Sequence, residues 1–227
     1  MGLFNRTVNI AEYGLFAGRT DWHCHILPGV DDGFKCMEDS LRALALYEKA
    51  GIQEVWLTPH IMEDIPNTTS VLKERFAELQ EAYKGPIALH LASENMMDPL
   101  FGERLEAGDL LPLIDNRLLV ETSYFNPPID LEGILDAVKS KGYFPLLAHP
   151  ERYMYMDMRH YRRLKADGIE FQLNISSLAG AYGSMVKDKA ERLLKAGMYN
   201  YSGTDLHRVS SMEHMLQASL RKKYIAL

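Results

Sequence analysis

TDWHCHILPGVDDG, residues 20–33, starts with the pattern of a strand and ends in a Pro-Gly turn that carries two aspartates. His23 and His25 are separated by one residue, and a strand has a side-chain period of two. Both imidazoles are therefore expected on one face of the strand, with Cys24 on the other. Burying such polar rings without partners costs free energy. The stretch therefore predicts that a binding site begins on the first strand of the fold.

Short apolar runs alternate with longer segments of helical period along the chain. This pattern is typical of repeated strand-helix units, and so of an α/β fold rather than a meander or a helical bundle. Glycines follow several helical segments, as expected where helices stop. The predicted helices are 37–51, 69–83, 130–142, 158–168 and 185–197. The predicted strands are 18–25, 53–59, 86–93, 117–123, 143–148, 169–174 and 198–204.

The length of 227 residues suits one α/β domain, and no linker interrupts the pattern. We therefore expect a single domain over residues 1–227, with 1–17 as an N-terminal arm. Segment 94–116 is the least regular and is predicted to be a loop with a short helix.

Composition narrows the class of protein. The net charge of −6 disfavours a nucleic-acid or anionic membrane surface. The absence of an apolar run of roughly 18 to 20 residues and of a signal-peptide pattern predicts no membrane insertion and a cytoplasmic location. The two cysteines, Cys24 and Cys36, cannot form a disulfide framework, which suits a reducing compartment.

Ionisable side chains stand where six of the seven predicted strands end. Such ends converge on one face of a parallel barrel, where catalytic residues usually lie. Imidazole nitrogens and carboxylate oxygens together suit Zn, Mn or Fe, and burying so many without a cation would cost several kcal/mol each. The pattern therefore predicts a metal centre. Its candidate residues are His23, His25, His60, Glu94, Glu121, His149, Asp205 and His207.

Neighbouring polar residues have less specific interpretations. Asp21 is expected on the face of His23, either orienting a ligand or serving as a hydrogen-bonding strand residue. Asp31 is interpreted as a turn or helix-cap residue. His90, deeper in its strand, and His160 and His214, on helices, are expected to be structural.

The motifs TDWHCHILPGVDDG, TPH, SENMMD, AHPERY and GTDLH, in this order between residues 20 and 208, resemble the polymerase and histidinol phosphatase (PHP) superfamily. They are most similar to its bacterial manganese-dependent protein-tyrosine phosphatases of capsular and exopolysaccharide synthesis. The resemblance implies a distorted (β/α)7 barrel with up to three divalent ions. Mn²⁺ is the metal it implies, with Fe or Zn as alternatives.

The resemblance also assigns residues. One ion would be bound by His23, His25, Glu94 and Asp205, a second by Glu94, Glu121 and His149, and a third by Asp32, His60 and His207. Arg152 matches the arginine that holds the phosphate, and a planar guanidinium suits that role because it can bind two oxygens. A second family arginine has only Arg208 as its counterpart. Asn95 replaces a larger residue, which implies an altered pocket rim.

The implied reaction is hydrolysis of phosphotyrosine on proteins by a metal-activated hydroxide that attacks phosphorus in line. Tyrosine is a good leaving group because its pKa is about 10, and either His207 or a metal-bound water is a candidate to assist its departure. The implied partner is the tyrosine-rich tail of a bacterial tyrosine autokinase.

Other functions fit parts of the sequence pattern. A small-molecule phosphomonoesterase, such as a histidinol-phosphate phosphatase, would use the same fold and ligands. Cys36 and Arg42 have the spacing of cysteine-dependent tyrosine phosphatases, but Glu38 and Asp39 between them would repel phosphate. No Gly-x-Ser-x-Gly motif supports a serine hydrolase. A non-catalytic metal scaffold would not need the full ligand set.

Overall fold

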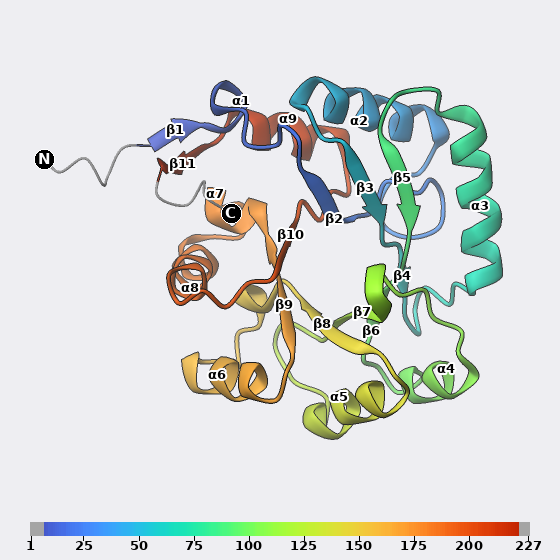
Figure 1. The fold of residues 1–227 in the computed structure, drawn as a ribbon, viewed down its shortest axis with the longest axis vertical. Helices are drawn as coiled ribbons and strands as arrows, with labels where there is room; N and C mark the ends of the chain where they lie inside the picture. Colours follow the sequence, from blue (N-terminus) through green and yellow to red (C-terminus); the bar gives the residue numbers. More distant parts are fainter. Residues whose placement is uncertain (1–6, 223–227) are drawn as a thin grey trace, which may run out of the picture.

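The computed structural model describes residues 7–222 and has a mixed α/β fold built on parallel strands (Figure 1). Every strand predicted from the alternating pattern is present. These strands are β2 (Thr20–Cys24), β3 (Glu54–Leu57), β5 (Ala88–Leu91), β7 (Arg117–Glu121), β8 (Phe144–Ala148), β9 (Glu170–Asn174) and β10 (Tyr201–Gly203). Two short strands, β4 (His60–Ile61) and β6 (Glu94–Met96), follow β3 and β5 directly.

The strands form two parallel sheets rather than one continuous seven-stranded ladder. One has the order β10-β9-β8-β7-β6-β4 and the other β2-β3-β5. The break falls at Pro59, which has no N–H to donate to a ladder. Backbone hydrogen bonds from Ala92 N to Leu57 O and from Glu94 N to Pro59 O cross the break. On the other side, a parallel bridge between Cys24 and Leu206 connects the sheets.

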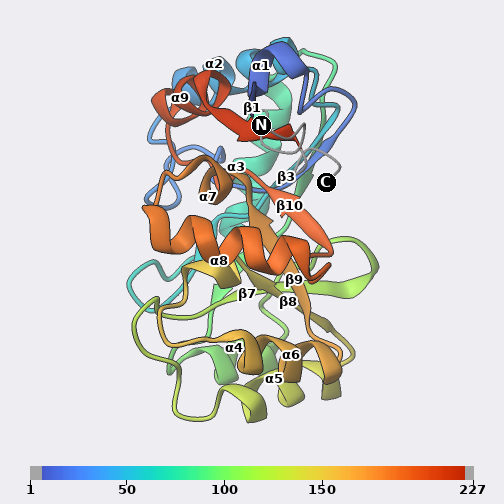
Figure 2. The ribbon, with the colours of Figure 1, turned by 90° about the vertical axis from the view of Figure 1, so that its left-hand side faces the viewer.

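Helices surround the strands on the outside (Figures 1 and 2). The five predicted helices are α2 (Met37–Ala50), α3 (Thr69–Ala82), α5 (Leu131–Ser140), α6 (Met158–Ala166) and α8 (Ser184–Lys195). Other helices are α4 (Phe101–Ala107), η2 (Ile114–Asn116), η3 (Pro150–Arg152), α7 (Ile175–Ala179) and α9 (Val209–Gln217). Gly51 ends α2 with a φ of 86°, a left-handed conformation that glycine adopts without strain.

Two large apolar clusters fill the space between strands and helices, and a smaller one lies on the opposite face of the strands. Leu119 of β7 and Leu146 of β8 belong to this smaller cluster, and Trp22 and Trp56 pack against it with their ring centroids 5.9 Å apart. Because side chains alternate along a strand, Glu121 shares the face of Leu119. The inner face is therefore apolar at its base and polar where the strands end.

The predicted N-terminal arm is partly regular structure. β1 (Thr7–Asn9) pairs antiparallel with β11 (Ser219–Arg221), and α1 (Ile10–Tyr13) follows it. Residues 1–6 of the arm lie outside the described residues. Segment 94–116 contains the expected short helix, α4, together with β6 and η2.

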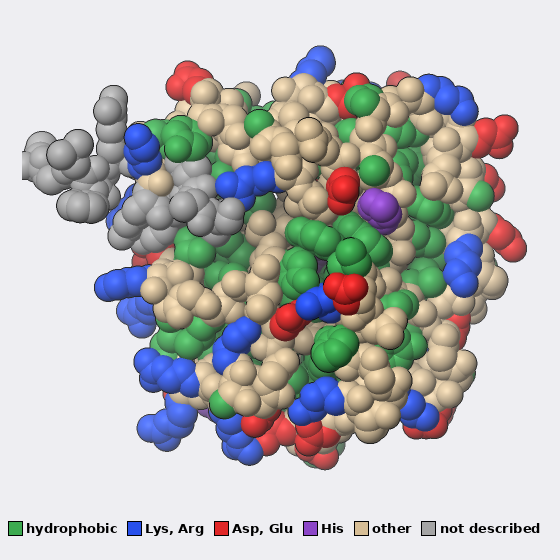
Figure 3. Space-filling model, viewed as in Figure 1, with side chains coloured by type: hydrophobic (Ala, Val, Ile, Leu, Met, Phe, Trp, Pro, Cys, Tyr) green, Lys and Arg blue, Asp and Glu red, His purple; other side chains and the backbone are tan. Residues whose placement is uncertain are grey.

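The surface is mixed in character. In Figure 3, hydrophobic side chains gather near the centre of the face, and Lys and Arg side chains gather over α6 and α8. Within residues 7–222, no helix is both long and apolar enough to cross a bilayer.

Candidate metal centre

The eight strand-end residues predicted from the pattern, together with Asp32, converge at the carboxyl ends of the strands. Nearly all are buried, with Glu94 and the first two histidines 0% exposed, whereas the side chains of Asp32 and His207 are open to solvent. They come from β2 and the turn after it, from the first residues of β4 and β6, and from the ends of β7, β8 and β10. Residues far apart in the sequence thus form one cluster.

The most buried part of this cluster contains His23, His25, Glu94 and Asp205. The Nε2 atoms of the two histidines are 3.1 Å apart, and they lie 3.1 and 3.2 Å from Glu94 Oε2. Each is also 3.4 Å from Asp205 Oδ1. Four donor atoms therefore face one small volume.

Hydrogen bonds behind the two histidines fix their orientation. His23 Nδ1 donates to Gln172 Oε1 at 3.0 Å, and His25 Nδ1 donates to Asp31 Oδ2 at 2.8 Å. With Nδ1 protonated, each neutral ring directs the lone pair of Nε2 toward the carboxylates, as metal-binding histidines do. Gln172 and Asp31 thus orient His23 and His25 so that both Nε2 lone pairs could bind the same cation.

Without a cation, protons must neutralise the group. Burial disfavours the charged form of His23, but Glu94 and Asp205 outweigh it and raise the pKa to about 9. Burial raises the pKa of Glu94, but His23 and His60 outweigh that effect and hold it well below its usual range. The carboxylates therefore stay ionised and attract positive charge to the centre.

A second group adjoins the first through Glu94. His60 Nδ1 lies 3.2 Å from Glu94 Oε2 and 3.1 Å from Glu121 Oε1. His149 Nε2 approaches the other oxygen of Glu94 at 3.0 Å and Glu121 Oε2 at 3.7 Å. Glu94 therefore faces both groups, which is the placement that a bridging carboxylate requires.

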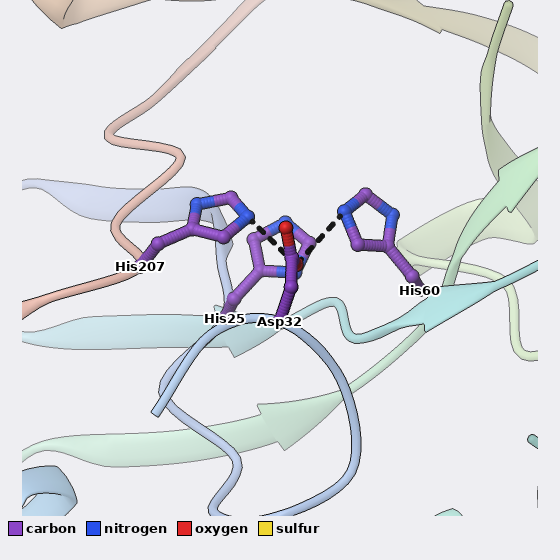
Figure 4. A group of neighbouring side chains, drawn as sticks. All are labelled: His25, Asp32, His60 and His207. Atoms are coloured by element: carbon purple, nitrogen blue, oxygen red, sulfur yellow. Dashed lines mark ion pairs between the residues drawn. The ribbon is translucent and has the colours of Figure 1, made fainter. Parts of the chain in front are cut away.

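The third group lies at the open side of the cluster and contains His25, Asp32, His60 and His207 (Figure 4). Asp32 Oδ1 is 3.6 Å from His60 Nε2 and 3.3 Å from His207 Nε2. His207 Nδ1 donates to the backbone carbonyl of Asp205, which turns Nε2 toward Asp32. The family-based grouping expects Asp32, His60 and His207 here, and the structure adds His25.

The donor set fits divalent cations. Bonds of about 2.0–2.2 Å place neighbouring ligand atoms roughly 3.0–3.5 Å apart, which is close to the separations above. Within the described residues, several buried polar atoms also lack a hydrogen-bond partner. Those in the cluster are His60 Nδ1, Glu94 Oε2, Glu121 Oε1 and His149 Nδ1. Buried atoms of this kind normally have partners, and a cation that accepts the lone pairs of His60 Nδ1, Glu94 Oε2 and Glu121 Oε1 would supply one.

Two candidate ligands have strained backbones. His149 has a φ of 33° and Asp205 a φ of 53°, values that residues with a Cβ rarely adopt. Such conformations cost about 1–3 kcal/mol each and often occur at functional sites. The strained residues His149 and Asp205 both follow the ends of strands, and their side chains point into the cluster.

A cavity of about 710 Å³ opens onto the cluster. Arg152 lines it, and its Nη1 donates to Asp205 Oδ2 at 2.8 Å. Arg208 also lines the cavity, but it is exposed, and its side chain makes no hydrogen bond or ion pair within the part of the chain that is described. The structure thus brings Arg152 beside the candidate ligands and leaves Arg208 at the rim.

Asn95 is not among the residues that line the cavity. Its side chain is buried and bonds to Ser93 and to the backbone carbonyl of Leu119, away from the cavity. Asn95 stands one residue after Glu94, so strand alternation turns it to the opposite face.

Asp21 and Asp31 have different roles from each other. Asp21 accepts from Tyr47 and Thr204 and meets His23 only through its backbone N–H, which agrees with a hydrogen-bonding strand residue. A register shift between Asp21 and Cys24 breaks the expected alternation. Asp31 accepts from Gly33 N, as a turn residue does, but it also orients His25.

The remaining predicted residues lie outside the three groups. His90 stacks on Trp56, His160 caps α6, and His214 lines the cavity from α9. Cys36 is the exposed N-cap residue of α2, where Arg42 pairs with Asp39. Neither Cys36 nor Arg42 lines the cavity, so a cysteine-dependent mechanism has no support.

Sequence reasoning missed Gln172, Tyr124 and Tyr182. Gln172 precedes the end of β9 by two residues, so its place on the inner face follows from strand alternation. Tyr124 and Tyr182 line the cavity from loops. Their positions depend on loop conformations, and loop sequences have no periodic pattern from which these conformations could be predicted.

Comparisons with known proteins agree with this geometry. The family model "Capsular polysaccharide synthesis, CpsB/CapC" matches residues 19–225. The tyrosine-protein phosphatase YwqE of Bacillus subtilis (strain 168) is 29% identical over 88% of this chain and 82% of its own length. The tyrosine-protein phosphatase CpsB of Streptococcus pneumoniae is 26% identical over 90% of each chain.

A solved structure is also similar. It comes from work on YwqE of Bacillus subtilis and CpsB of Streptococcus pneumoniae, described as unique metal-dependent tyrosine phosphatases. It superposes with a TM-score of 0.80 and 26% identity, and covers 91% of this chain and 84% of the solved chain. The fold and its parallel sheet are thus shared with these proteins.

Proposed function

This chain belongs to the CpsB/CapC family of capsular polysaccharide synthesis, and we propose that it is a metal-dependent protein-tyrosine phosphatase. Its relatives YwqE and CpsB are named as tyrosine-protein phosphatases. The observation that carries the proposal is the cluster of buried lone pairs and carboxylates that faces a cavity beside Arg152. That arrangement combines cation sites with a side chain suited to phosphate.

The proposed ligands form three sets. His23, His25, Glu94 and Asp205 hold one cation, Glu94, Glu121 and His149 hold a second, and Asp32, His60 and His207 hold a third. His60 also faces Glu94 and Glu121, and His25 also faces the third set. Mn²⁺ is the proposed metal, with Fe or Zn as alternatives, because imidazole and carboxylate ligands suit all three.

The bound ions would supply a nucleophile by lowering the pKa of water, and would neutralise the phosphate oxygens. Arg152 would bind two further oxygens through its planar guanidinium. His207, which lies at the open side of the cluster, would assist departure of the tyrosine through the third cation that it holds, because its Nδ1 already donates to the backbone carbonyl of Asp205. Because that leaving group has a pKa of about 10, it needs less protonation than an alkyl alcohol, and aryl phosphates are the preferred substrates.

Further parts of the proposal rest on the family resemblance. The strands, whose two sheets are bridged at Cys24 and Leu206, would form the distorted (β/α)7 barrel of the PHP superfamily as a single domain. The enzyme would act in the cytoplasm on the tyrosine-rich tail of a bacterial tyrosine kinase.

The test is hydrolysis of a phosphotyrosyl peptide by chelator-stripped protein, with and without added Mn²⁺. We expect turnover only with the metal, and the same turnover in a Cys36→Ser variant, because Cys36 lies outside the cavity. Histidinol phosphate serves as the competing substrate. Turnover of histidinol phosphate without turnover of the peptide would replace the proposal by the small-molecule alternative, and metal-independent turnover would contradict both.

A further inference from the structure

Arg152 lies between two tyrosine rings from separate parts of the chain. Its guanidinium carbon is 4.2 Å from the centroid of the Tyr124 ring and 4.3 Å from that of the Tyr182 ring. Tyr124 follows β7, Arg152 ends the short helix η3, and Tyr182 lies between α7 and α8. Contacts of a guanidinium with ring faces are attractive and restrict its plane. Arg152 is therefore held by aromatic contacts in the wall of the cavity.

Most of the guanidinium donors of Arg152 have no acceptor among the described residues. Nη1 donates to Asp205 Oδ2 at 2.8 Å, and within residues 7–222 the other guanidinium N–H groups have no acceptor. An arginine has five N–H donors in one plane. The remaining donors of Arg152 lie along the edge of its guanidinium, where two phosphate oxygens can bind side by side.

Tyr182 is tied to the same carboxylate by a second route. Asn174 Nδ2 lies 3.0 Å from the Tyr182 hydroxyl oxygen and 2.9 Å from Asp205 Oδ2. The hydroxyl accepts this hydrogen bond while the ring packs on Arg152. Tyr182 is nonetheless 38% exposed and lies in a loop, so the fold does not depend on its burial.

We propose that Tyr124 and Tyr182, the tyrosine pair, are positioning residues that hold Arg152 ready for the phosphate group. This inference rests on the proposed phosphatase function. A free arginine side chain loses rotamer freedom when it binds a ligand, whereas Arg152 has already lost much of it in the unliganded protein. The tyrosine pair therefore strengthens phosphate binding in the ground state and the transition state alike. Its effect is on KM rather than on kcat.

The experiment replaces Tyr182 with Ala in the Mn²⁺-loaded protein. We expect KM for a phosphotyrosyl peptide and Ki for inorganic phosphate to rise about tenfold, with kcat within about twofold of the original. Tyr182→Phe keeps the ring and removes only the hydroxyl, so it should restore both constants. Phe144→Leu removes an exposed ring that lies 6.0 Å from the guanidinium carbon of Arg117, outside the cavity, and should change neither.

A double-mutant cycle separates positioning from general damage. In an Arg152→Ala background, Tyr182→Ala should have no further effect, because the side chain that it positions is gone. An equal loss in both backgrounds would overturn the inference. So would unchanged KM and Ki in Tyr182→Ala, or a loss confined to kcat.

Phosphate binding is also measured directly by isothermal titration calorimetry, which does not require turnover. Tenfold weaker phosphate binding in Tyr182→Ala, restored in Tyr182→Phe, would support the positioning role even in a protein that hydrolyses no peptide. Inactivity of the original chain would then count against the proposed function alone. Equal phosphate affinity in all variants would count against the tyrosine pair.

Discussion

His25 Nδ1 lies 2.8 Å from Asp31 Oδ2, and this contact fixes which nitrogen of His25 faces the cluster. The opposite nitrogen is thereby left 3.2 Å from Glu94. An aspartate in the turn after β2 thus sets which ring nitrogen of His25, at the end of that strand, can bind a cation.

Replacing Asp31 with Asn tests this control. The amide keeps the shape of the side chain but removes the negative charge that favours the required tautomer, so Mn²⁺ affinity should fall about 10–100-fold. A metal titration followed by calorimetry measures the change. Asp39→Asn, an exposed carboxylate on α2, is the control and should bind Mn²⁺ like the original protein. Equal affinities in both variants would remove the proposed role of Asp31.

Metal removal should destabilise the fold. A ligand that binds only the folded state adds about 2.7 kcal/mol to the free energy of unfolding when its concentration is 100 times Kd. We therefore expect Tm to rise when Mn²⁺ is added to chelator-stripped protein and to fall again with excess chelator. Ca²⁺, which prefers oxygen ligands, should raise Tm less at equal concentration. A Tm that does not change when Mn²⁺ is added would argue against the proposed metal site.

The metal-free protein should lose stability as the pH rises above neutrality. The pKa of His23 is about 9 in the folded protein and about 6.5 when unfolded, so protonated His23 contributes stability below about pH 6.5 and loses it as the pH rises through 9. Each pKa unit corresponds to about 1.4 kcal/mol. Urea unfolding of chelated protein between pH 6.5 and 9.5 measures the slope. His23→Asn should reduce the slope without abolishing it, because the pKa values of His25 and His60 are also raised in the folded protein. A flat profile in the original chain would contradict the prediction.

Arg152→Lys should reduce kcat/KM for a phosphotyrosyl peptide about 10–100-fold. Lysine keeps the positive charge but loses the paired donors that bind two phosphate oxygens, and it cannot pack its planar face against a ring. Steady-state kinetics of the Mn²⁺-loaded variant measure the loss. Arg162→Lys, an exposed change on α6, provides the reference and should leave kcat/KM unaltered. Full activity in Arg152→Lys would show that bidentate binding is unnecessary.

The strands were predictable because each is a short apolar run followed by a helix with its own period. The charged strand ends, such as His23 and Asp205, were predictable for the same reason, since a parallel arrangement brings carboxyl ends together. Their separation of 3.4 Å could not be predicted, because it depends on the packing of every strand between them.

Other features depend on contacts that a sequence pattern does not encode. β1 and β11 pair although Val8 and Leu220 lie at opposite ends of the chain, and three residues are too few for a clear strand signal. Gln172 is uncharged and stands on a strand that ends without an ionisable group, so nothing in its type distinguishes it from a core amide. The side chain of Asp31 accepts hydrogen bonds both from the turn backbone at Gly33 and from His25. Only the turn contact can be predicted from the neighbouring sequence.

The candidate metal cluster lies beside the bridge between Cys24 and Leu206, which connects the two sheets. β2 and β10 meet through few backbone hydrogen bonds, among them His25 N to Leu206 O at 2.9 Å and Asp205 N to His23 O at 2.8 Å. Side chains from both sides of this seam face one another in the first proposed set, so a bound cation would cross-link β2 to the segment that follows β10. Loop-closure entropy makes such a link most effective between distant residues. When the metal is released, amide hydrogen exchange at this seam should therefore become faster before exchange in the rest of the fold does.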